Sequence, residues 1–402
     1  MGGTEATFTI TSDEVGDVKT INIPAGADYT IDGGNFTVNY SFNMDATADK
    51  NSALRIMNLV MDGKETLTAA INSQNQITKP NELTLSVVDS VITNYTNKGM
   101  YLTNVKNLLV DNVEFDNLAF TEQEWYKGDY TIDINLIGVQ DAEITIKNST
   151  FSGKAGGNAP IKVTQRGGFD DINTDIPYYV QGHSNTPASV KSLVIENCDF
   201  TNVTDNSKGD VCIGSSPNAD GTARTSATAY SYKVVAKEGT TTEVYTRSTT
   251  EAETSGVNKP VVVEAGSPLM QLTNYFLNSD DSNLELEVNK THQLSYYFGD
   301  KGAIIVNAPA VTFRSSDDEI VSVSNDGVIT ANKEGTATIY ATYENGEYTW
   351  QVKVVKTSEI ETPTDEVSDV TNPETSDGVL IFLGLTVIGF AGVLLTYRRL
   401  HN

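Results

Sequence analysis

Short runs of alternating hydrophobic and polar residues recur through the first half of the chain, and they share one pattern. Two apolar residues lie two positions apart, Asn or Asp follows two positions later, and another apolar residue comes three positions after that. Five copies fit this pattern, at residues 53–63, 84–94, 107–117, 143–153 and 192–202, and residues 28–38 form a weaker first copy. Alternation with a period of two predicts strands with one buried face, so this half of the chain is predicted to be all-β.

The polar residue in the middle of each copy predicts a sharp bend, because Asn and Asp tolerate the left-handed backbone conformation. Stacked copies would bring the bend residues into a structural ladder, which consists of Asn58, Asp89, Asn112, Asn148 and Asn197. They would also align two apolar columns, one from Leu54 to Leu193 and the other from Met61 to Phe200. Apolar stretches between the copies supply further walls, at residues 100–105, 132–139, 160–163 and 211–213.

The spacing of the copies is irregular, which is natural for stacked coils that carry inserted loops. Because of these repeated copies, residues 1–275 resemble a right-handed parallel β-helix of the pectate-lyase-like superfamily. An all-β sandwich with coincidental repeats is the alternative, since strands that alternate with Asn and Gly turns occur there as well. Residues 221–260 are rich in Thr, Ala and Ser, and we interpret them as an insertion or a cap.

A second module is predicted at residues 283–356. It contains the motifs Phe313-Arg314-Ser315-Ser316-Asp317, Gly327-Val328-Ile329-Thr330-Ala331 and Gly335-Thr336-Ala337-Thr338-Ile339. These resemble the group 2 bacterial immunoglobulin-like domain, and the resemblance implies a small β-sandwich. The Asn-Asp-Gly sequence that ends at Gly327 favours a tight turn with positive φ, as such a sandwich requires.

The end of the chain has the layout of an anchor. Residues 357–377 form an acidic linker without Lys or Arg, which cannot bury enough apolar surface to fold. The uncharged residues 379–395 would span about 25 Å as a helix at about 1.5 Å per residue, and Arg398 and Arg399 follow them. Residues 378–402 are therefore predicted to be a transmembrane helix with a basic cytoplasmic tail.

Five residues before this apolar run carry a second signal, Asn372-Pro373-Glu374-Thr375-Ser376. The order of motif, apolar run and basic tail resembles the sorting signal of Gram-positive surface proteins. The resemblance implies that a sortase cuts after Thr375 and joins it to peptidoglycan, which leaves the protein anchored in the cell wall and exposed outside the cell. A plain C-terminal membrane anchor is the alternative. No secretory signal peptide precedes the first strand-like residues, so we expect a trimmed form of a secreted precursor.

The amino-acid composition limits the classes of binding partner and the number of disulfides. The 402 residues include 53 acidic and 27 basic ones, a net charge of -26, which repels phosphate backbones and argues against nucleic acid as a partner. The two cysteines allow at most one disulfide, and Cys198 lies in a core copy, where a buried thiol is expected.

The pectate-lyase-like resemblance implies an enzyme as one functional alternative. Lyases of this type use Lys or Arg as a base beside a uronic acid and hold calcium with acidic residues. The matching candidates here are Lys162 and Arg166 as catalytic residues, with Asp133, Asp170, Asp171 and Asp210 as acidic partners. Ca²⁺ is the candidate cofactor, although no metal-ligand spacing is evident. Ordinary charges on outward faces of strands are the competing interpretation.

Two long loops carry aromatic residues that could contact a ligand. Residues 120–130 contain Trp125 and Tyr126, and residues 169–183 contain Tyr178 and Tyr179. Exposed aromatic rings can stack on the apolar faces of sugars, whereas the same rings could simply pack against the wall of the coil. The leading hypothesis is a cell-wall-anchored surface protein that displays a β-helix for adhesion or glycan binding, with a glycan or a host surface as its ligand. A surface-attached polysaccharide lyase or glycoside hydrolase is the alternative, and a purely architectural surface module is a third.

Overall fold

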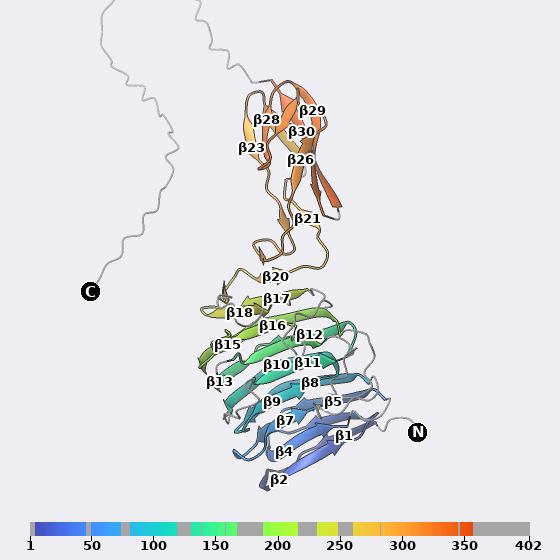
Figure 1. Cartoon of the computed structure of the whole chain (residues 1–402), viewed down its shortest axis with the longest axis vertical. Coiled ribbons are helices and arrows are strands. Elements are labelled where there is room, and N and C mark those ends of the chain that lie inside the picture. Colours follow the sequence, from blue (N-terminus) through green and yellow to red (C-terminus); the bar gives the residue numbers. More distant parts are fainter. Residues whose placement is uncertain are drawn as a thin grey trace, which may run out of the picture. The chain divides into compact units, whose positions relative to one another are not determined.

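The structure, a computed structural model, describes residues 5–45, 50–73, 81–118, 130–137, 139–156, 158–166, 188–215, 231–247, 260–281, 283–344 and 346–356. These residues form thirty strands and no helix, which confirms the predicted all-β class. Strands β1 to β20 belong to one large sheet, and most of the later strands form a separate small module (Figure 1).

Three walls of parallel strands make up the large sheet. Wall A consists of β1 (Glu5–Thr9), β3 (Asp28–Asp32), β5 (Ser52–Met57), the first parts of β8 (Leu83–Thr93) and β10 (Val105–Leu118), β12 (Ala142–Lys147), the first part of β15 (Val190–Thr204) and β17 (Tyr232–Ala236). Wall B consists of the start of β4 (Thr37–Met44), β6 (Val60–Asp62), the later parts of β8 and β10, β13 (Thr150–Lys154) and the later part of β15.

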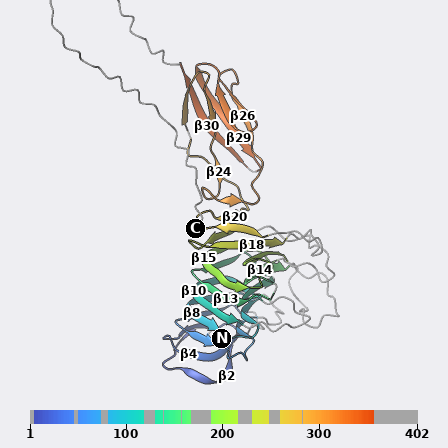
Figure 2. The ribbon, with the colours of Figure 1, turned by 90° about the vertical axis from the view of Figure 1, so that its left-hand side faces the viewer.

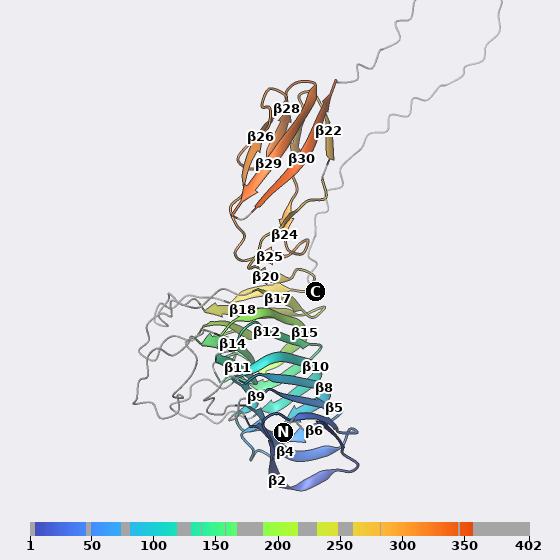
Figure 3. The same ribbon diagram turned by 90° about the vertical axis from the view of Figure 1, so that its right-hand side faces the viewer.

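Wall C closes the coil and contains most of the apolar stretches that lie between the sequence copies. It consists of β2 (Glu14–Ile23), the later part of β4, β7 (Ala69–Asn72), β9 (Lys98–Leu102), β11 (Ile132–Ile137), β14 (Ile161–Arg166), β16 (Val211–Ser215) and β18 (Thr241–Arg247). Every pairing within the three walls is parallel, so each pass of the chain lies on the pass before it. Figures 2 and 3 show this stack of parallel strands from two further sides.

Antiparallel strands end the stack. β19 (Val261–Glu264) pairs with β18, and β20 (Leu269–Gln271) pairs with β17. β20 also pairs in parallel with the short β25 (Ile304–Ile305). Residues 231–247, within the segment interpreted as an insertion or cap, thus contain β17 and β18, which continue walls A and C by one pass.

The predicted apolar columns are confirmed by the strand register. Leu54, Leu85, Leu108, Ile144 and Leu193 are successive register partners in wall A. In wall B, Met61, Ile92, Phe115 and Phe151 follow one another in the same way. All of these side chains belong to one buried core, which also contains the predicted buried thiol of Cys198. The core therefore stabilises the stack mainly through contacts between equivalent residues of neighbouring passes.

The bend residues all have a left-handed backbone. The φ angles are 53° for Asn58, 48° for Asp89, 54° for Asn112, 52° for Asn148 and 55° for Asn197. Asn112 donates a side-chain hydrogen bond of 2.6 Å to Asp89, and Asn197 donates one of 2.8 Å to Asn148. Asn148 itself donates to Asp111 and Asn58 to Asp32, so the amide contacts do not run through all five residues.

The predicted immunoglobulin-like module is confirmed as a small β-sandwich. One sheet consists of β22 (Asn283–Glu287), β30 (Gly346–Val355), β29 (Gly335–Tyr343) and β26 (Thr312–Ser315), and the other of β23 (Thr291–Gln293), β28 (Val328–Ala331) and β27 (Val321–Val323). A two-stranded sheet of β21 (Leu277–Asn278) and β24 (Tyr297–Phe298) adds to it. Trp350 is fully buried between the sheets and packs against Phe313.

Residues 357–402 lie outside the described residues, and so do the predicted sorting motif at 372–376 and the predicted transmembrane helix at 379–395. Over the ranges that the structure describes, no helix has the length and apolar character needed to cross a membrane.

Candidate functional site

Wall C brings one predicted catalytic residue to one of its predicted acidic partners. Lys162 in β14 is the register partner of Asp133 in β11, and its Nζ lies 3.1 Å from Asp133 Oδ1. Lys98, at the start of β9, places its Nζ 3.1 Å from Asp133 Oδ2. The contact at Oδ1 is an ion pair without hydrogen-bond geometry. One carboxylate therefore lies between two ammonium groups.

This cluster is buried under aromatic rings. Only 6% of the Asp133 side chain is exposed, and the two lysine side chains are 12% and 13% exposed. The Lys162 ammonium lies 4.6 Å from the centre of the Tyr130 ring, and Lys98 lies within 5.7 Å of the same ring. Such cation–π contacts stabilise the charged form of a lysine.

The electrostatics of this cluster favour the ionised form of Asp133. Burial alone would raise the pKa of Asp133, but the ammonium groups of Lys162 and Lys98 outweigh burial and hold this pKa below its ordinary value. A lysine that acts as a general base must be free to reach a substrate proton, whereas Lys162 Nζ lies 3.1 Å from Asp133 Oδ1 and 4.6 Å from the centre of the Tyr130 ring. The arrangement thus fits a buried ion-pair network better than a base.

Within the part of the chain that the structure describes, no other candidate named from the sequence lies in this cluster. Arg166 ends β14 as the register partner of Ile137, and its side chain lies outside the described part of the structure. Asp210 pairs with other residues, which are discussed below. Six further candidates fall outside the described residues, namely Asp170, Asp171, Trp125, Tyr126, Tyr178 and Tyr179.

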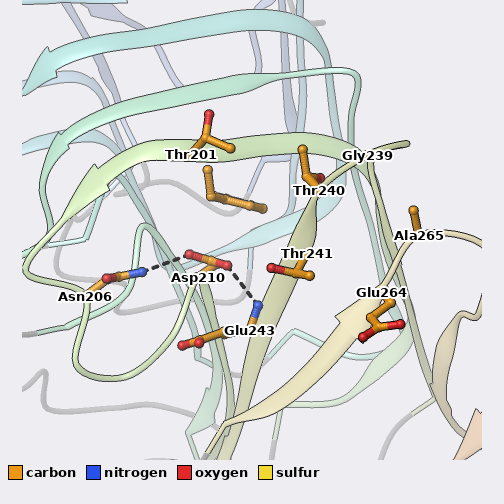
Figure 4. A pocket seen from close by; sticks show the side chains of 10 residues that line it. Thr201, Asn206, Asp210, Gly239, Thr240, Thr241, Glu243, Glu264 and Ala265 are labelled. Carbon is orange, nitrogen blue, oxygen red and sulfur yellow. Dashed lines mark hydrogen bonds between the residues drawn. The ribbon is translucent and has the colours of Figure 1, made fainter. Parts of the chain in front are cut away.

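A polar cavity of about 670 Å³ lies around Asp210, near the last pass of the coil (Figure 4). It is formed by the end of β15, the turn before β16, the turn between β17 and β18, the start of β18, and the end of β19. The lining residues are Phe200, Thr201, Asn206, Asp210, Gly239, Thr240, Thr241, Glu243, Glu264 and Ala265.

The backbone of the turn before β16 fixes the position of Asp210. Asp210 N donates to the Glu243 carbonyl at 2.8 Å, and the Asp210 carbonyl accepts from Ile161 N at 3.2 Å. Gly209 precedes it with a φ of 71°, and a Cβ there would lie 2.7 Å from the carbonyl oxygen of Glu243. Glycine is required at this position because both the φ angle and the close approach exclude a side chain.

Two hydrogen bonds orient the Asp210 carboxylate, as Figure 4 shows. Oδ1 accepts from Asn206 Nδ2 at 2.9 Å, and Oδ2 accepts from the backbone N of Glu243 at 2.8 Å. Only 6% of the residue is exposed. Burial raises the pKa of Asp210 to about 6; the hydrogen bond from Glu243 N opposes this, and the nearby Glu243 charge adds to it. This carboxyl can therefore exchange a proton near neutral pH.

The cavity begins where the aromatic column ends. Phe151 stacks on Phe200 with ring centres 4.9 Å apart. In the next pass Ala236 pairs with Cys198, and Lys237 forms an ion pair of 2.9 Å with Asp199. The pairing of β15 with β17 ends at Cys198, and Phe200 itself is only 5% exposed.

No metal centre is evident in the described ranges, where no three His, Cys, Asp or Glu side chains gather as ligands. The sequence-based expectation of calcium thus remains a prediction. Sequence reasoning named Asp210 but missed the threonines and glutamates around it. The available signal was the loss of the repeating pattern after residue 202, which marks the end of the regular passes.

Comparison with known proteins defines one part of the chain. Residues 277–354 match the bacterial Ig-like domain (group 2). Among solved structures, domains 4 and 5 of the S-layer protein SbsC match at 19% sequence identity, over 29% of this chain and 65% of that one, with a TM-score of 0.18. The chain covers less than two thirds of that structure, and the TM-score is too low to support a conclusion about fold or function. No curated protein matches the chain.

Proposed function

We propose that this protein is attached to a Gram-positive cell wall and binds a glycan through a right-handed parallel β-helix of the pectate-lyase-like type. The parallel stacking of walls A, B and C supports the β-helix part of the proposal. The bacterial Ig-like domain at residues 277–354 supports a location at the cell surface, where it would act as a spacer.

The observation that carries glycan binding is the polar cavity around Asp210. It combines hydroxyl and carboxylate oxygens, which suit the hydroxyl groups of a sugar, and the nearly buried ring of Phe200 closes one side of it. Its volume of about 670 Å³ lies within the range of small-ligand sites, which is roughly 300–1,000 Å³.

A panel of bacterial and host polysaccharides tests this function. Thr201→Val and Glu264→Gln change two lining residues, and each should weaken binding of the glycan that the unmodified protein retains. Glu238→Gln is a matched control, because Glu238 is exposed in the turn between β17 and β18 and does not line the cavity. Absence of binding to every polysaccharide, or equal binding by all three variants, would contradict the proposal.

Attachment to the wall rests on the sequence 372–376, the apolar residues 379–395 and the basic residues after them. Sortase and peptidoglycan would be the partners, and the membrane segment would hold the chain only until processing. Thr375→Ala should move the protein from the wall fraction to the membrane or the medium. Thr371→Ala removes a threonine just outside the motif and should leave fractionation unchanged.

One observation favours an enzyme as a second candidate. Asp210, whose burial raises its pKa to about 6, lines the cavity together with Glu243 and Glu264, and glycoside hydrolysis uses two carboxyl groups, of which the general acid has a raised pKa. Release of reducing ends from a bound polysaccharide, lost in Asp210→Asn, would support a glycoside hydrolase. Unsaturated products that are lost in Lys162→Ala or Arg166→Ala, with calcium required, would instead support a lyase. Retention of the glycan without turnover supports binding alone.

A further inference from the structure

One apolar column of wall A runs the whole length of the stack and is covered at one end only. Its successive register partners are Phe8, Ile31, Ile56, Val87, Val110, Ile146, Ile195 and Val234. At the far end, Leu269 of the antiparallel strand β20 lies opposite Val234, and both are fully buried. At the near end Phe8 is 47% exposed, whereas its partner Ile31 is 6% exposed. Among the described strands, none covers Phe8 on the side away from Ile31.

A small apolar cavity lies beside Phe8 at this near end. Its volume is about 230 Å³, and side chains from the first strands of walls A and C line it. Phe8 and Tyr29 belong to wall A, and Ile21 and Phe42 to wall C. Apolar surface of this kind gains free energy when another apolar surface covers it.

The backbone of β1 offers a free edge next to this cavity. β3 is the only described strand that pairs with β1, and β1 and β20 lie at opposite ends of the stack (Figure 1). Ile10, just after β1, donates from its N to the Asp32 carbonyl at 2.9 Å. Because amide groups alternate along a strand, those of every second residue before it, including Thr7, point toward the free edge. Such an edge is a template for a further strand.

The sequence of β1 is self-complementary in an antiparallel pair centred on Thr7. On the core side, Ala6 of each copy would lie opposite Phe8 of the other, so that a small side chain meets a large one. On the outer side, Glu5 would lie opposite Thr9, so that no carboxylate faces another. Thr7 would exchange both of its edge-directed backbone hydrogen bonds with Thr7 of the second copy.

We propose that two copies of this chain associate end to end through antiparallel pairing of their β1 strands. The second copy covers Phe8 in the way that β20, which is also antiparallel, covers Val234 at the far end. A two-fold axis beside Thr7 brings the apolar ends of the two coils together in an isologous interface. This association does not depend on glycan binding. The net charge of -26 on each copy opposes it through long-range repulsion.

Single cysteines in β1 of the full chain test the position of the axis. Opposite residues of a hydrogen-bonded antiparallel pair have Cα atoms about 5.5 Å apart, which suits a disulfide. Thr7→Cys should therefore form a covalent dimer when oxidised by dissolved oxygen, as seen on a non-reducing gel. Thr9→Cys should not, because its two copies would lie four residues apart along the pair, or about 13 Å. The natural cysteines, Cys198 and Cys212, are buried, so the unmodified protein is the baseline.

Three outcomes of this experiment would overturn the inference. Thr7→Cys could stay monomeric, or Thr9→Cys could form as much covalent dimer as Thr7→Cys. Thr7→Cys could also stay uncross-linked when purified but join a different polypeptide on cells, which would mean that a foreign strand occupies this edge.

Sedimentation equilibrium of the full chain measures the strength of association. Phe8→Ala should raise the dimer dissociation constant at least about tenfold. Val262→Ala is the matched control, because Val262 is 48% exposed and lies in β19 at the far end of the stack. High salt should strengthen the association, because it screens the repulsion between two acidic copies. Association that persists unchanged in Phe8→Ala belongs to another surface and would contradict the inference.

Discussion

Lys162 Nζ and Asp133 Oδ1 are 3.1 Å apart, and the two residues are direct register partners on neighbouring strands of wall C. Asp133 also pairs with Lys98, and all three side chains are nearly buried. A buried carboxylate with two ammonium partners is costly to break apart, because removal of the anion leaves uncompensated positive charge in a region of low dielectric constant.

The first prediction concerns this anion. Asp133→Asn should lower the free energy of unfolding by about 3–5 kcal/mol, as measured by urea denaturation. Lys162→Met should cost less, because the Asp133–Lys98 pair remains. Lys191→Met is the control, since its ion pair with Glu143 is exposed and should contribute little to stability. A small effect of Asp133→Asn would show that the cluster contributes little to stability.

The second prediction concerns the left-handed bends. Asn112 has a φ of 54° and donates to Asp89. Both Asn112→Gly and Asn112→Ala remove this hydrogen bond, but only alanine is strained at positive φ. The alanine variant should therefore be less stable than the glycine variant by about 1 kcal/mol in chemical denaturation. Equal stability would mean that the bend does not keep its left-handed conformation in solution.

The bend at Asn112 and the ion-pair cluster at Asp133 differ in how far they could be predicted from the sequence. The apolar columns and the bend at Asn112 follow from a local period of two and from the conformational preference of Asn, and both are visible in a single copy of the pattern. The pairing of Lys98 with Asp133 depends on which pass lies above which. Lys98 belongs to none of the copies, so no periodic signal pointed to it.

The cavity could not be predicted for a related reason. It arises where the pattern stops, because the pairing of β15 with β17 ends at Cys198 and Ala236. Asp210 was recognised as an acidic residue, but its burial and its contact with Glu243 depend on the close approach of two backbones at Gly209. A loss of pattern indicates that a regular element ends, and it does not indicate which side chains then line the space.

The third prediction tests that close approach with two glycines of similar φ. Gly209 and Gly239 have φ angles of 71° and 75°, but only at Gly209 would a Cβ meet backbone, 2.7 Å from the Glu243 carbonyl oxygen. Gly239→Ala should cost about 1 kcal/mol from its φ angle alone. Gly209→Ala should cost at least about 2 kcal/mol, because the two passes must also move apart. Thermal unfolding of the two variants compares them directly, and similar losses would contradict the close packing of the Asp210 turn.

The fourth prediction concerns the pH dependence of stability at Asp210. Its pKa is about 6 in the folded protein and near its ordinary value of 3.8 in the unfolded chain. Between these values the folded state holds a proton that the unfolded state has lost. The contribution of Asp210 to the free energy of unfolding should therefore decrease as pH rises from about 4 to about 6, and stay low above that.

Asp210→Asn isolates this effect because asparagine does not titrate. Each pKa unit corresponds to about 1.4 kcal/mol, so the stability of the variant relative to the unmodified protein should rise by up to about 3 kcal/mol between pH 4 and pH 7. The comparison uses the change with pH rather than the absolute difference, because asparagine also loses one of the two hydrogen bonds that Asp210 accepts. Urea denaturation at pH 4, 5, 6 and 7 provides the measurement, with the exposed Glu238→Gln as a control. Parallel curves for Asp210→Asn and the unmodified protein would mean that Asp210 has the same pKa in the folded and the unfolded protein. In that case the cavity around Asp210 would be open to water.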